Sequence, residues 1–190
     1  MTTDRPDIAI VYCKNSLNRE ELISIENELA KCDMMLVANE RSPYINASID
    51  FFVPLVQILL SPDMVNAVCQ GLLTNAAWDA IKAVLIHIFR KFRNKPVFKL
   101  QGENVTEEIP NIHFVIGNNV LALPMNVDEE KFKYAVDKFM DISASSTPEK
   151  VTYTFYSDEE NAVMQKTEDD IIQEEYKKWL EKKNLEQEVK

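Results

Sequence analysis

Two side chains of this chain could take part in acid–base or nucleophilic chemistry, the imidazole of His113 and the thiol of Cys13. An imidazole titrates near neutral pH. The thiol stands at the end of the first predicted strand, a position where α/β proteins often bind ligands. Either group needs an activating or orienting partner within hydrogen-bond reach, and the neighbouring sequence supplies no such motif. A small hydrolase or transferase that uses His113 or Cys13 is one hypothesis, and a packed structural role for both is the other.

Three acidic clusters, at 128–130, 158–160 and 168–170, are the next candidates for chemistry. The first and third stand at predicted helix starts, where carboxylates offset the helix dipole, and the second stands in a predicted turn. A hydrolase places its two carboxylates on opposite sides of a substrate, so we interpret these clusters as solvated caps. The three cysteines form no Cys-x-x-Cys pair and lie near no histidine in the sequence. Reduced thiols are therefore predicted, with no metal site and no cofactor.

The composition is that of a folded, acidic protein. The chain has 190 residues, an apolar fraction of 46%, a charged fraction of 27% and a net charge of −10, which is typical of one globular domain. The negative charge repels nucleic-acid backbones, and we expect no nucleic-acid partner. Neither a signal peptide nor a lipidation motif is visible. Together with the reduced thiols, this predicts a cytoplasmic location.

The segment 51–92 is the most apolar part of the chain. Residues 51–60 are expected to form a short helix. The Ser-Pro-Asp sequence at 61–63 suits the N-cap, the first position and the first turn of a second helix, which we expect to run to about residue 92. These two helices are predicted to form a buried apolar hairpin at the centre of the domain.

Gly71 falls in the middle of the long predicted helix, where a glycine costs about 1 kcal/mol relative to alanine. The chain has only three glycines, so this one predicts a steric reason for its position. Close packing against the preceding helix is one explanation, and a kink or hinge is the other.

Four cations close the apolar segment, namely Arg90, Lys91, Arg93 and Lys95. Cations at a helix C-terminus interact favourably with the helix dipole, which is a purely structural explanation. Alternatively, an apolar hairpin with a basic end could be released from the fold and embed in an anionic membrane surface. The apolar run at 64–78 is shorter than the roughly 18–20 residues that cross a bilayer, so no constitutive span is predicted.

The rest of the chain alternates between strand and helix patterns. A strand at 8–13, a helix opened by the Asn-x-x-Glu sequence at 18–21 and a strand at 34–38 predict a βαβ unit with parallel strands. Residues 111–123 follow the pattern of a β-hairpin, and residues 151–156 alternate as a strand. We predict an α+β fold, with a mixed sheet of about six or seven strands, an N-terminal βαβ unit, a central buried apolar helical hairpin and a C-terminal charged helix.

The last segment, 167–190, is predicted to be an amphipathic helix that follows a single α+β domain of residues 1–166. Large aromatic side chains on its stripe are typical of protein interfaces. The segment either docks on its own domain or acts as an assembly arm for a second copy or another protein. The apolar stripe consists of Ile172, Tyr176, Trp179 and Leu180.

A large supply of apolar side chains without a catalytic motif favours a non-enzymatic cytosolic protein–protein interaction or self-assembly module. Its partner is expected to be another protein or a second copy in a homo-oligomer. Two alternatives stay open, a membrane-acting protein that exposes 51–92 with its basic tail, and the hydrolase or transferase described above. The expected interaction residues are Tyr176, Trp179, Leu180, Arg90, Lys91 and Arg93.

Overall fold

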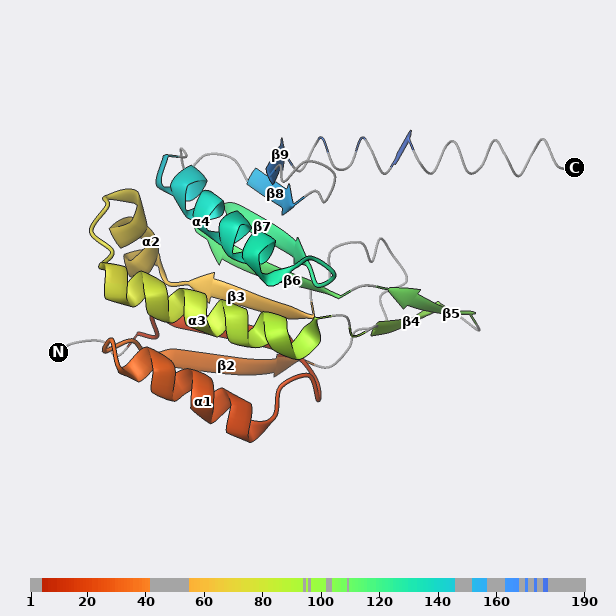
Figure 1. The fold of residues 1–190 in the computed structure, drawn as a ribbon, viewed down its shortest axis with the longest axis horizontal. Helices are drawn as coiled ribbons and strands as arrows, with labels where there is room; N and C mark the ends of the chain where they lie inside the picture. The colour runs from red at the N-terminus through yellow and green to blue at the C-terminus, as the bar shows by residue number, and fades with distance from the viewer. Residues whose placement is uncertain are drawn as a thin grey trace, which may run out of the picture.

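The chain folds as an α+β protein around a mixed sheet, as the sequence predicts, and Figure 1 shows its arrangement in a computed structural model. Most of the chain is described up to residue 145, and shorter pieces are described after it. The described residues are 5–41, 55–93, 95, 97–101, 104–108, 110–145, 152–156, 163–167, 170, 173 and 176–177.

The main sheet is built on five neighbouring strands in the order β2-β1-β3-β6-β7. β1 pairs in parallel with β2 and antiparallel with β3, and β3 pairs in parallel with β6, which is antiparallel to β7. Beyond β7, β8 pairs in parallel and β9 then pairs antiparallel to β8. In chain order these strands are β1 (Ile8–Cys13), β2 (Leu36–Arg41), β3 (Val56–Leu60), β6 (Asn111–Ile116), β7 (Asn119–Pro124), β8 (Thr152–Tyr156) and β9 (Val163–Thr167).

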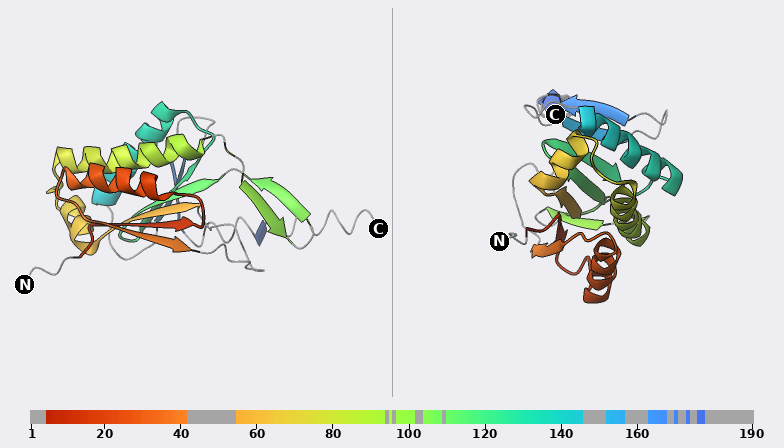
Figure 2. Two further views of the ribbon diagram at one scale, coloured as in Figure 1. Left: turned by 90° about the horizontal axis from the view of Figure 1, so that it is seen from below. Right: turned by 90° about the vertical axis from the view of Figure 1, so that its left-hand side faces the viewer.

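A separate two-stranded ladder is formed by β4 (Val97–Gln101) and β5 (Asn104–Glu108). It follows α3 in the chain and precedes β6. Figure 1 and the left view of Figure 2 both show this ladder projecting from one end of the main sheet. It therefore adds no strand to the sheet that holds the core.

In the described part of the chain up to residue 145, four helices accompany the sheet, α1 (Arg19–Ala30), α2 (Pro62–Cys69), α3 (Asn75–Phe92) and α4 (Glu129–Ser145). α1, α3 and α4 lie side by side along one face of the sheet, with α3 in the middle (Figure 1, and the left view of Figure 2). α2 packs against α4. The result is two layers, one of helices and one of strands.

The helices begin where the sequence places good caps. Asn18 and Glu21 form a reciprocal capping box at the start of α1. The Ser61 hydroxyl accepts the backbone N–H of Met64 at the start of α2, where proline occupies the first helical position. Such side chains satisfy backbone N–H groups that the first turn of a helix leaves without a partner.

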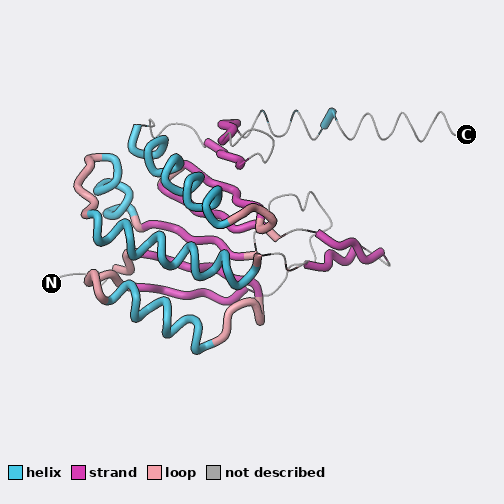
Figure 3. The backbone as a smooth tube through the Cα atoms, in the orientation of Figure 1, coloured by secondary structure: helices cyan, strands magenta, loops and turns pink. Residues whose placement is uncertain are grey.

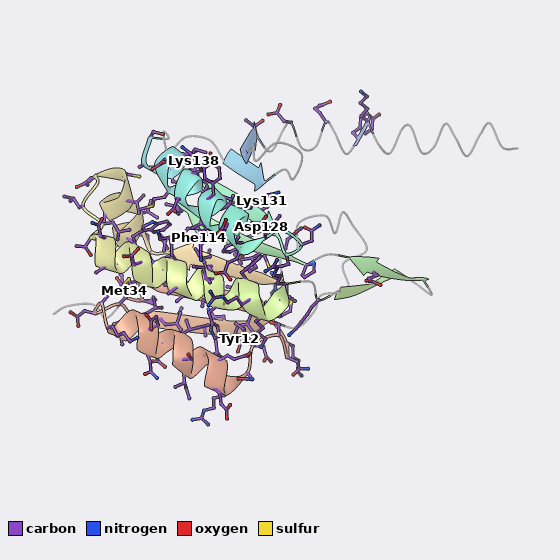
Figure 4. All side chains as sticks on the ribbon, viewed as in Figure 1. Tyr12, Met34, Phe114, Asp128, Lys131 and Lys138 are labelled. Carbon is purple, nitrogen blue, oxygen red and sulfur yellow. The ribbon has the colours of Figure 1, made fainter. Side chains whose placement is uncertain are left out.

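The core lies between the two layers and is centred on α3. The Phe114 ring, on β6, lies 6.3 Å from the ring of Trp78 and 5.6 Å from that of Phe139 (Figure 4). Phe89 stacks on Phe132 with ring centroids 4.3 Å apart. These contacts join the sheet, α3 and α4, since each aromatic pair crosses from one element to another. The buried side chains of α3 are Ala80, Ile81, Val84, Leu85, Ile88, Phe89 and Phe92.

The expected short helix at 51–60 is wrong over its described part. Residues 56–60 form the strand β3, in which Val56, Ile58 and Leu60 are buried and the two residues between them are partly exposed. This is the period of two of a strand that has one covered face. Residues 51–54 lie outside the described residues. A short apolar run does not distinguish a strand from a buried helix by its pattern alone.

The single long helix expected at 62–92 is also wrong, so the central helical hairpin is not present in the predicted form. The segment is divided into α2 and α3, with a connection around Gly71 between them (Figure 3). Gly71 has φ +65°, and a Cβ added there would meet no atom within 4 Å. The glycine therefore ends α2 in a left-handed conformation, and close packing is not its reason.

Candidate interaction surface

One face of the main sheet carries no packed helix of the α1–α4 layer, and we call it the outer face. Along β1 the buried side chains are Ile8, Ile10 and Tyr12, which belong to the core under the helices. The side chains between them, among them Ala9 and Val11, are partly exposed. Because successive side chains of a strand point to opposite faces, this alternation assigns Ala9 and Val11 to the outer face.

An apolar row crosses the outer face from one strand to the next. The strand register pairs Ala9 with Val37 on one side and with Leu59 on the other. Leu59 is paired in turn with Val115, and Val115 with Val120. We call these five residues the apolar row. It spans the five strands of the main sheet without a polar side chain.

The end of the apolar row at β2 is the more exposed end. β2 is the first strand in the order of the sheet, so Val37 has a paired neighbour strand on one side. Its side chain is 38% exposed, and that of Met35, just before the strand, is 47% exposed. Exposed apolar side chains at a sheet edge are a feature that monomeric proteins usually avoid.

An open hollow of about 230 Å³ lies at the middle of the apolar row. Ala9 and Leu59 line it from the sheet, and Pro6 and Pro62 line it from the segments beside them. Arg5 and Asp63 add one charge of each sign. The hollow is large enough for one apolar side chain of a partner, and its walls offer mainly apolar contacts.

A second row of the outer face contains His113. The register aligns Val11 with Gln57, Gln57 with His113, and His113 with Ala122. His113 is only 6% exposed. Burial lowers the pKa of its imidazole to about 4, and the positive charge of Arg41 lowers it further in the same direction. His113 is therefore neutral at pH 7.

The two candidate catalytic residues are not brought together. Cys13 lies two residues beyond the row of His113 and two strands away from it, since β3 separates β1 from β6. Standard strand spacings put their Cα atoms about 12 Å apart, too far for a direct hydrogen bond between a nucleophile and its base. The geometry gives no support to a Cys13–His113 pair.

Cys13, Cys32 and Cys69 are not joined by disulfides. Cys32 points its sulfur at the backbone oxygen of Ala76, 3.4 Å away, and Cys69 points at that of Ser143, 3.8 Å away. In the part of the chain that the structure describes, no three His, Cys, Asp or Glu side chains gather as a metal ion would require.

Two of the three predicted interaction cations bind carboxylates of this same chain. The Arg90 guanidinium donates to both carboxylate oxygens of Glu129, at 2.7 and 2.8 Å. Lys91 forms an ion pair with Glu21. The Arg90 hydrogen bonds, assisted by Lys133, lower the pKa of Glu129 to about 2. These contacts fasten the end of α3 to α4 and to α1.

Arg93 is the third predicted interaction cation, and a groove lies between α1 and α3. Arg93 is exposed and caps α3, with its guanidinium 5.7 Å from the centre of the Phe89 ring. A groove of about 370 Å³ runs between α1 and α3 and includes His87, Glu28 and Arg90 in its lining. Glu28 forms an ion pair with Lys31, and Arg90 forms one with Glu129. The carboxylate and the guanidinium that line the groove are therefore already paired within the chain.

The C-terminal segment begins with Thr167, the last residue of β9. The backbone N–H and the hydroxyl of Thr167 donate to the Asp170 carboxylate, at 2.9 and 2.7 Å, and the Asp170 N–H donates back to Thr167 at 3.3 Å. Tyr176 is helical and 57% exposed. Trp179 and Leu180, the other predicted interaction residues of this segment, lie outside the described residues.

Comparisons of the chain with models of protein families, with curated proteins and with solved structures each found no match. Among the helices that are described, none has the length and apolar character needed to cross a bilayer.

Sequence reasoning missed the outer face of the sheet. The first strand is apolar at almost every position, so its sequence predicts burial on both faces. The sequence of β2 contains a signal for a solvent-facing side of the sheet, because the polar residues Asn39 and Glu40 follow Val37. Only the pairing of the strands shows that Val37, Ala9 and Leu59 lie in one row.

Proposed function

We propose that this protein is a non-enzymatic protein–protein interaction module of the cytosol that associates with a second copy of itself. The observation that supports the proposal most directly is the apolar row on the outer face. A contiguous apolar surface rimmed by polar residues is typical of a protein interaction site. The exposed side chains of Val37 and Met35 extend that surface to the edge of the sheet.

In this proposal the sheet has six or seven strands, because β8 and β9 continue the strand pairing beyond β7. A wider sheet enlarges the outer face without adding a helix to it. The five strands of the main sheet alone offer about 400 Å² on that face, from standard strand spacings. This is about half of what one partner contributes to an interface of standard size.

The state of the candidate catalytic groups supports a non-enzymatic role. His113 is buried and neutral at pH 7, so it lacks the imidazolium proton that a general acid donates. Cys13 lies about 12 Å from it by strand geometry. An enzyme of the predicted kind needs these two groups, or one of them with another partner, in one concave site.

The arrangement of the basic tail also favours a protein partner over a membrane. Arg90 and Lys91 are bound to Glu129 and Glu21, so their charges are partly neutralised before any membrane is met. The apolar side chains of α3 form the centre of the core. A membrane-inserting state requires that core to open.

Size-exclusion chromatography with light scattering tests the proposal over a wide concentration range. We expect the full chain to be a dimer at high concentration. The chain that ends at Lys166 is expected to be a monomer, because it lacks the predicted assembly arm. A full chain that is monomeric at every concentration, with no protein recovered from a cell extract, would contradict the proposed function.

A further inference from the structure

We propose that the edge of β2 that faces away from β1 binds an extended, basic peptide segment of a partner protein as an additional strand of the main sheet. We call this edge the open edge, and it consists of the backbone groups of Leu36, Ala38 and Glu40. The inference goes beyond the proposed function, since the site is separate from the outer face and its partner is not a second copy. In strand addition of this kind, main-chain hydrogen bonds supply the affinity.

The strand register shows which backbone groups of β2 lie at the open edge. The N–H of Ile8 donates to the backbone oxygen of Met35 at 3.1 Å. At the other end of the strand, the N–H of Lys14 donates to the backbone oxygen of Arg41 at 2.8 Å. Ile8 is in register with Leu36, and a residue of a parallel ladder bonds to the two neighbours of its register partner. The odd-numbered residues of β2 therefore direct their backbone groups to β1, and the even-numbered residues direct theirs away from it.

The open edge has no partner strand in the described part of the chain. β2 is the first strand in the order of the sheet, so it pairs on one side only. Glu40 is exposed, and Leu36 and Ala38 are partly exposed. Their N–H and carbonyl groups are presented along about 13 Å of strand. A row of donors and acceptors at this spacing is complementary to an extended backbone and is a template for another strand.

The position of α1 favours a single extended segment over the edge of a second copy. α1 reaches past β2 on the side away from β1 (Figure 1, and the right view of Figure 2). If two open edges paired antiparallel about a two-fold axis, the sheet would be continuous and both α1 helices would lie over the junction in the same layer. Packed helices need about 8–10 Å between their axes. A segment that carries no helix of its own does not meet this obstacle.

Charge near the open edge favours a basic segment. Glu40 on β2 and Asp33 just before the strand are both exposed, and neither forms an ion pair with another described residue. Arg41, the cation of this strand, is partly buried and acts on His113. The net charge of −10 attracts a cationic segment from solution. A lysine of the added strand beside Glu40 then forms a favourable cross-strand pair.

Fluorescence anisotropy with the full chain tests the inference. The probe is a fluorescein-labelled octapeptide of alternating threonine and lysine. The matched control is the same peptide with every backbone nitrogen methylated, which keeps the side chains and the charge but has no N–H donors. We expect saturable binding of the probe below about 1 mM and binding of the control that is about tenfold weaker or more. Equal binding of both peptides would show attraction by charge alone and would overturn the inference.

Ala38→Pro is the variant that closes the open edge. Proline is tolerated in an edge strand where the N–H faces away from the ladder, and the N–H of Ala38 does so by the register. We expect the folded variant to bind the probe about tenfold more weakly or less, while it dimerises as wild type does. If Ala38→Pro fails to fold by circular dichroism, Glu40→Lys takes its place, since it reverses an exposed charge at the same edge.

Amide exchange of the wild type gives a measurement that needs no variant. In the free protein the N–H groups of Leu36, Ala38 and Glu40 should exchange faster than those of Val37 and Asn39, which bond to β1. Saturation with the probe should slow the exchange of the first three about tenfold or more. If these three are already protected in the free protein, or if the probe leaves them unchanged, the inference is wrong.

A second pair of variants separates the open edge from the proposed function. Val37→Glu adds a charge to the outer face and keeps the backbone groups of the open edge. It should lose dimerisation but bind the probe within about threefold of wild type. Ile23→Glu is its matched control for dimerisation, since Ile23 is similarly exposed but lies on α1. A protein that is monomeric at every concentration yet binds the probe removes self-association and keeps the open edge, and a dimer that never binds the probe does the reverse.

Discussion

At the scale of single residues, Arg90 and Lys91 show how the end of α3 is held. Arg90 binds Glu129, which is 39 residues away in the chain, and Lys91 binds Glu21, which is 70 residues away. The sequence predicts cations at this helix end. It does not predict their carboxylate partners, because the pairing depends on which helices become neighbours in the folded chain.

Glu129→Gln is predicted to lower stability at pH 7, because it removes the charge that both Arg90 and Lys133 bind. The folded pKa of Glu129 is about 2, below its ordinary value of 4.5. The stability that ionisation contributes is therefore fully present above pH 4.5 and is lost as the pH falls toward 2. Urea unfolding at several pH values should show wild type and variant converging over that window.

Glu130→Gln is the matched control for this prediction, since Glu130 is an exposed neighbour in the first turn of the same helix. It should change stability less than Glu129→Gln at pH 7. A constant difference between wild type and Glu129→Gln from pH 7 down to pH 2 would show that the ion pair does not stabilise the fold.

A second prediction concerns His113, whose burial makes the stability of the fold depend on pH. The ordinary pKa of 6.5 applies to the unfolded chain, and the folded pKa is about 4. As the pH falls from 6.5 to 4, the unfolded state takes up a proton that the folded state does not, so stability decreases by up to about 3 kcal/mol. His113→Gln should remove this part of the pH dependence.

Urea unfolding at pH 7 and at pH 4.5 measures the effect, and the change in stability between the two pH values is the quantity compared. His87→Gln, at an exposed histidine of α3, serves as the control and should keep the wild-type change. If His113→Gln loses as much stability as wild type between these pH values, the imidazole is not buried in the folded state.

The position of His113 shows how far residue-level prediction reaches. His113 lies on the face of β6 opposite Ile112 and Phe114, since successive side chains of a strand alternate between faces. Its surroundings could not be predicted, because the paired residues Gln57 and Ala122, and Arg41, whose charge lowers the imidazole pKa, come from other strands.

At the scale of elements, capping signals were more reliable than apolar periodicity. The capping box at Asn18 and the N-cap at Ser61 each start a helix where the sequence predicts one. The apolar run at 56–60 is a strand instead of a helix, because a short run fits both. The N-cap at Thr74, which starts α3, was hidden inside the predicted long helix.

The substitution Gly71→Ala tests the division between α2 and α3, because the sign of its effect on folding stability differs between a divided and a continuous helix. Inside a continuous helix, alanine in place of glycine stabilises by about 1 kcal/mol. At φ +65° the same change forces a side chain into the left-handed region and should destabilise by about 1 kcal/mol. Gly71→Asn should cost less, because asparagine tolerates this conformation better. Thermal unfolding of wild type, Gly71→Ala and Gly71→Asn decides between a continuous helix and two separate helices.

At the scale of the whole molecule, the sequence predicts the α+β class and the mixed sheet. It does not predict that the helices cover one face of the sheet and not the other. The pattern of β1 is apolar on both faces, which is typical of a strand covered on both sides. In the folded chain α1, α3 and α4 all lie on one side of the sheet (Figure 2). Helix packing of this kind is set by the topology of the connections, which local periodicity does not encode.

The central claim is that the outer face binds protein, and sedimentation velocity of wild type beside Val37→Glu tests it most directly. Over a wide range of concentration, wild type and the Ile23→Glu control should shift from monomer to dimer together. Val37→Glu should stay monomeric over the same range while keeping the circular dichroism spectrum of the wild type. A folded Val37→Glu that dimerises as strongly as wild type, or a wild type that never dimerises, would contradict the claim.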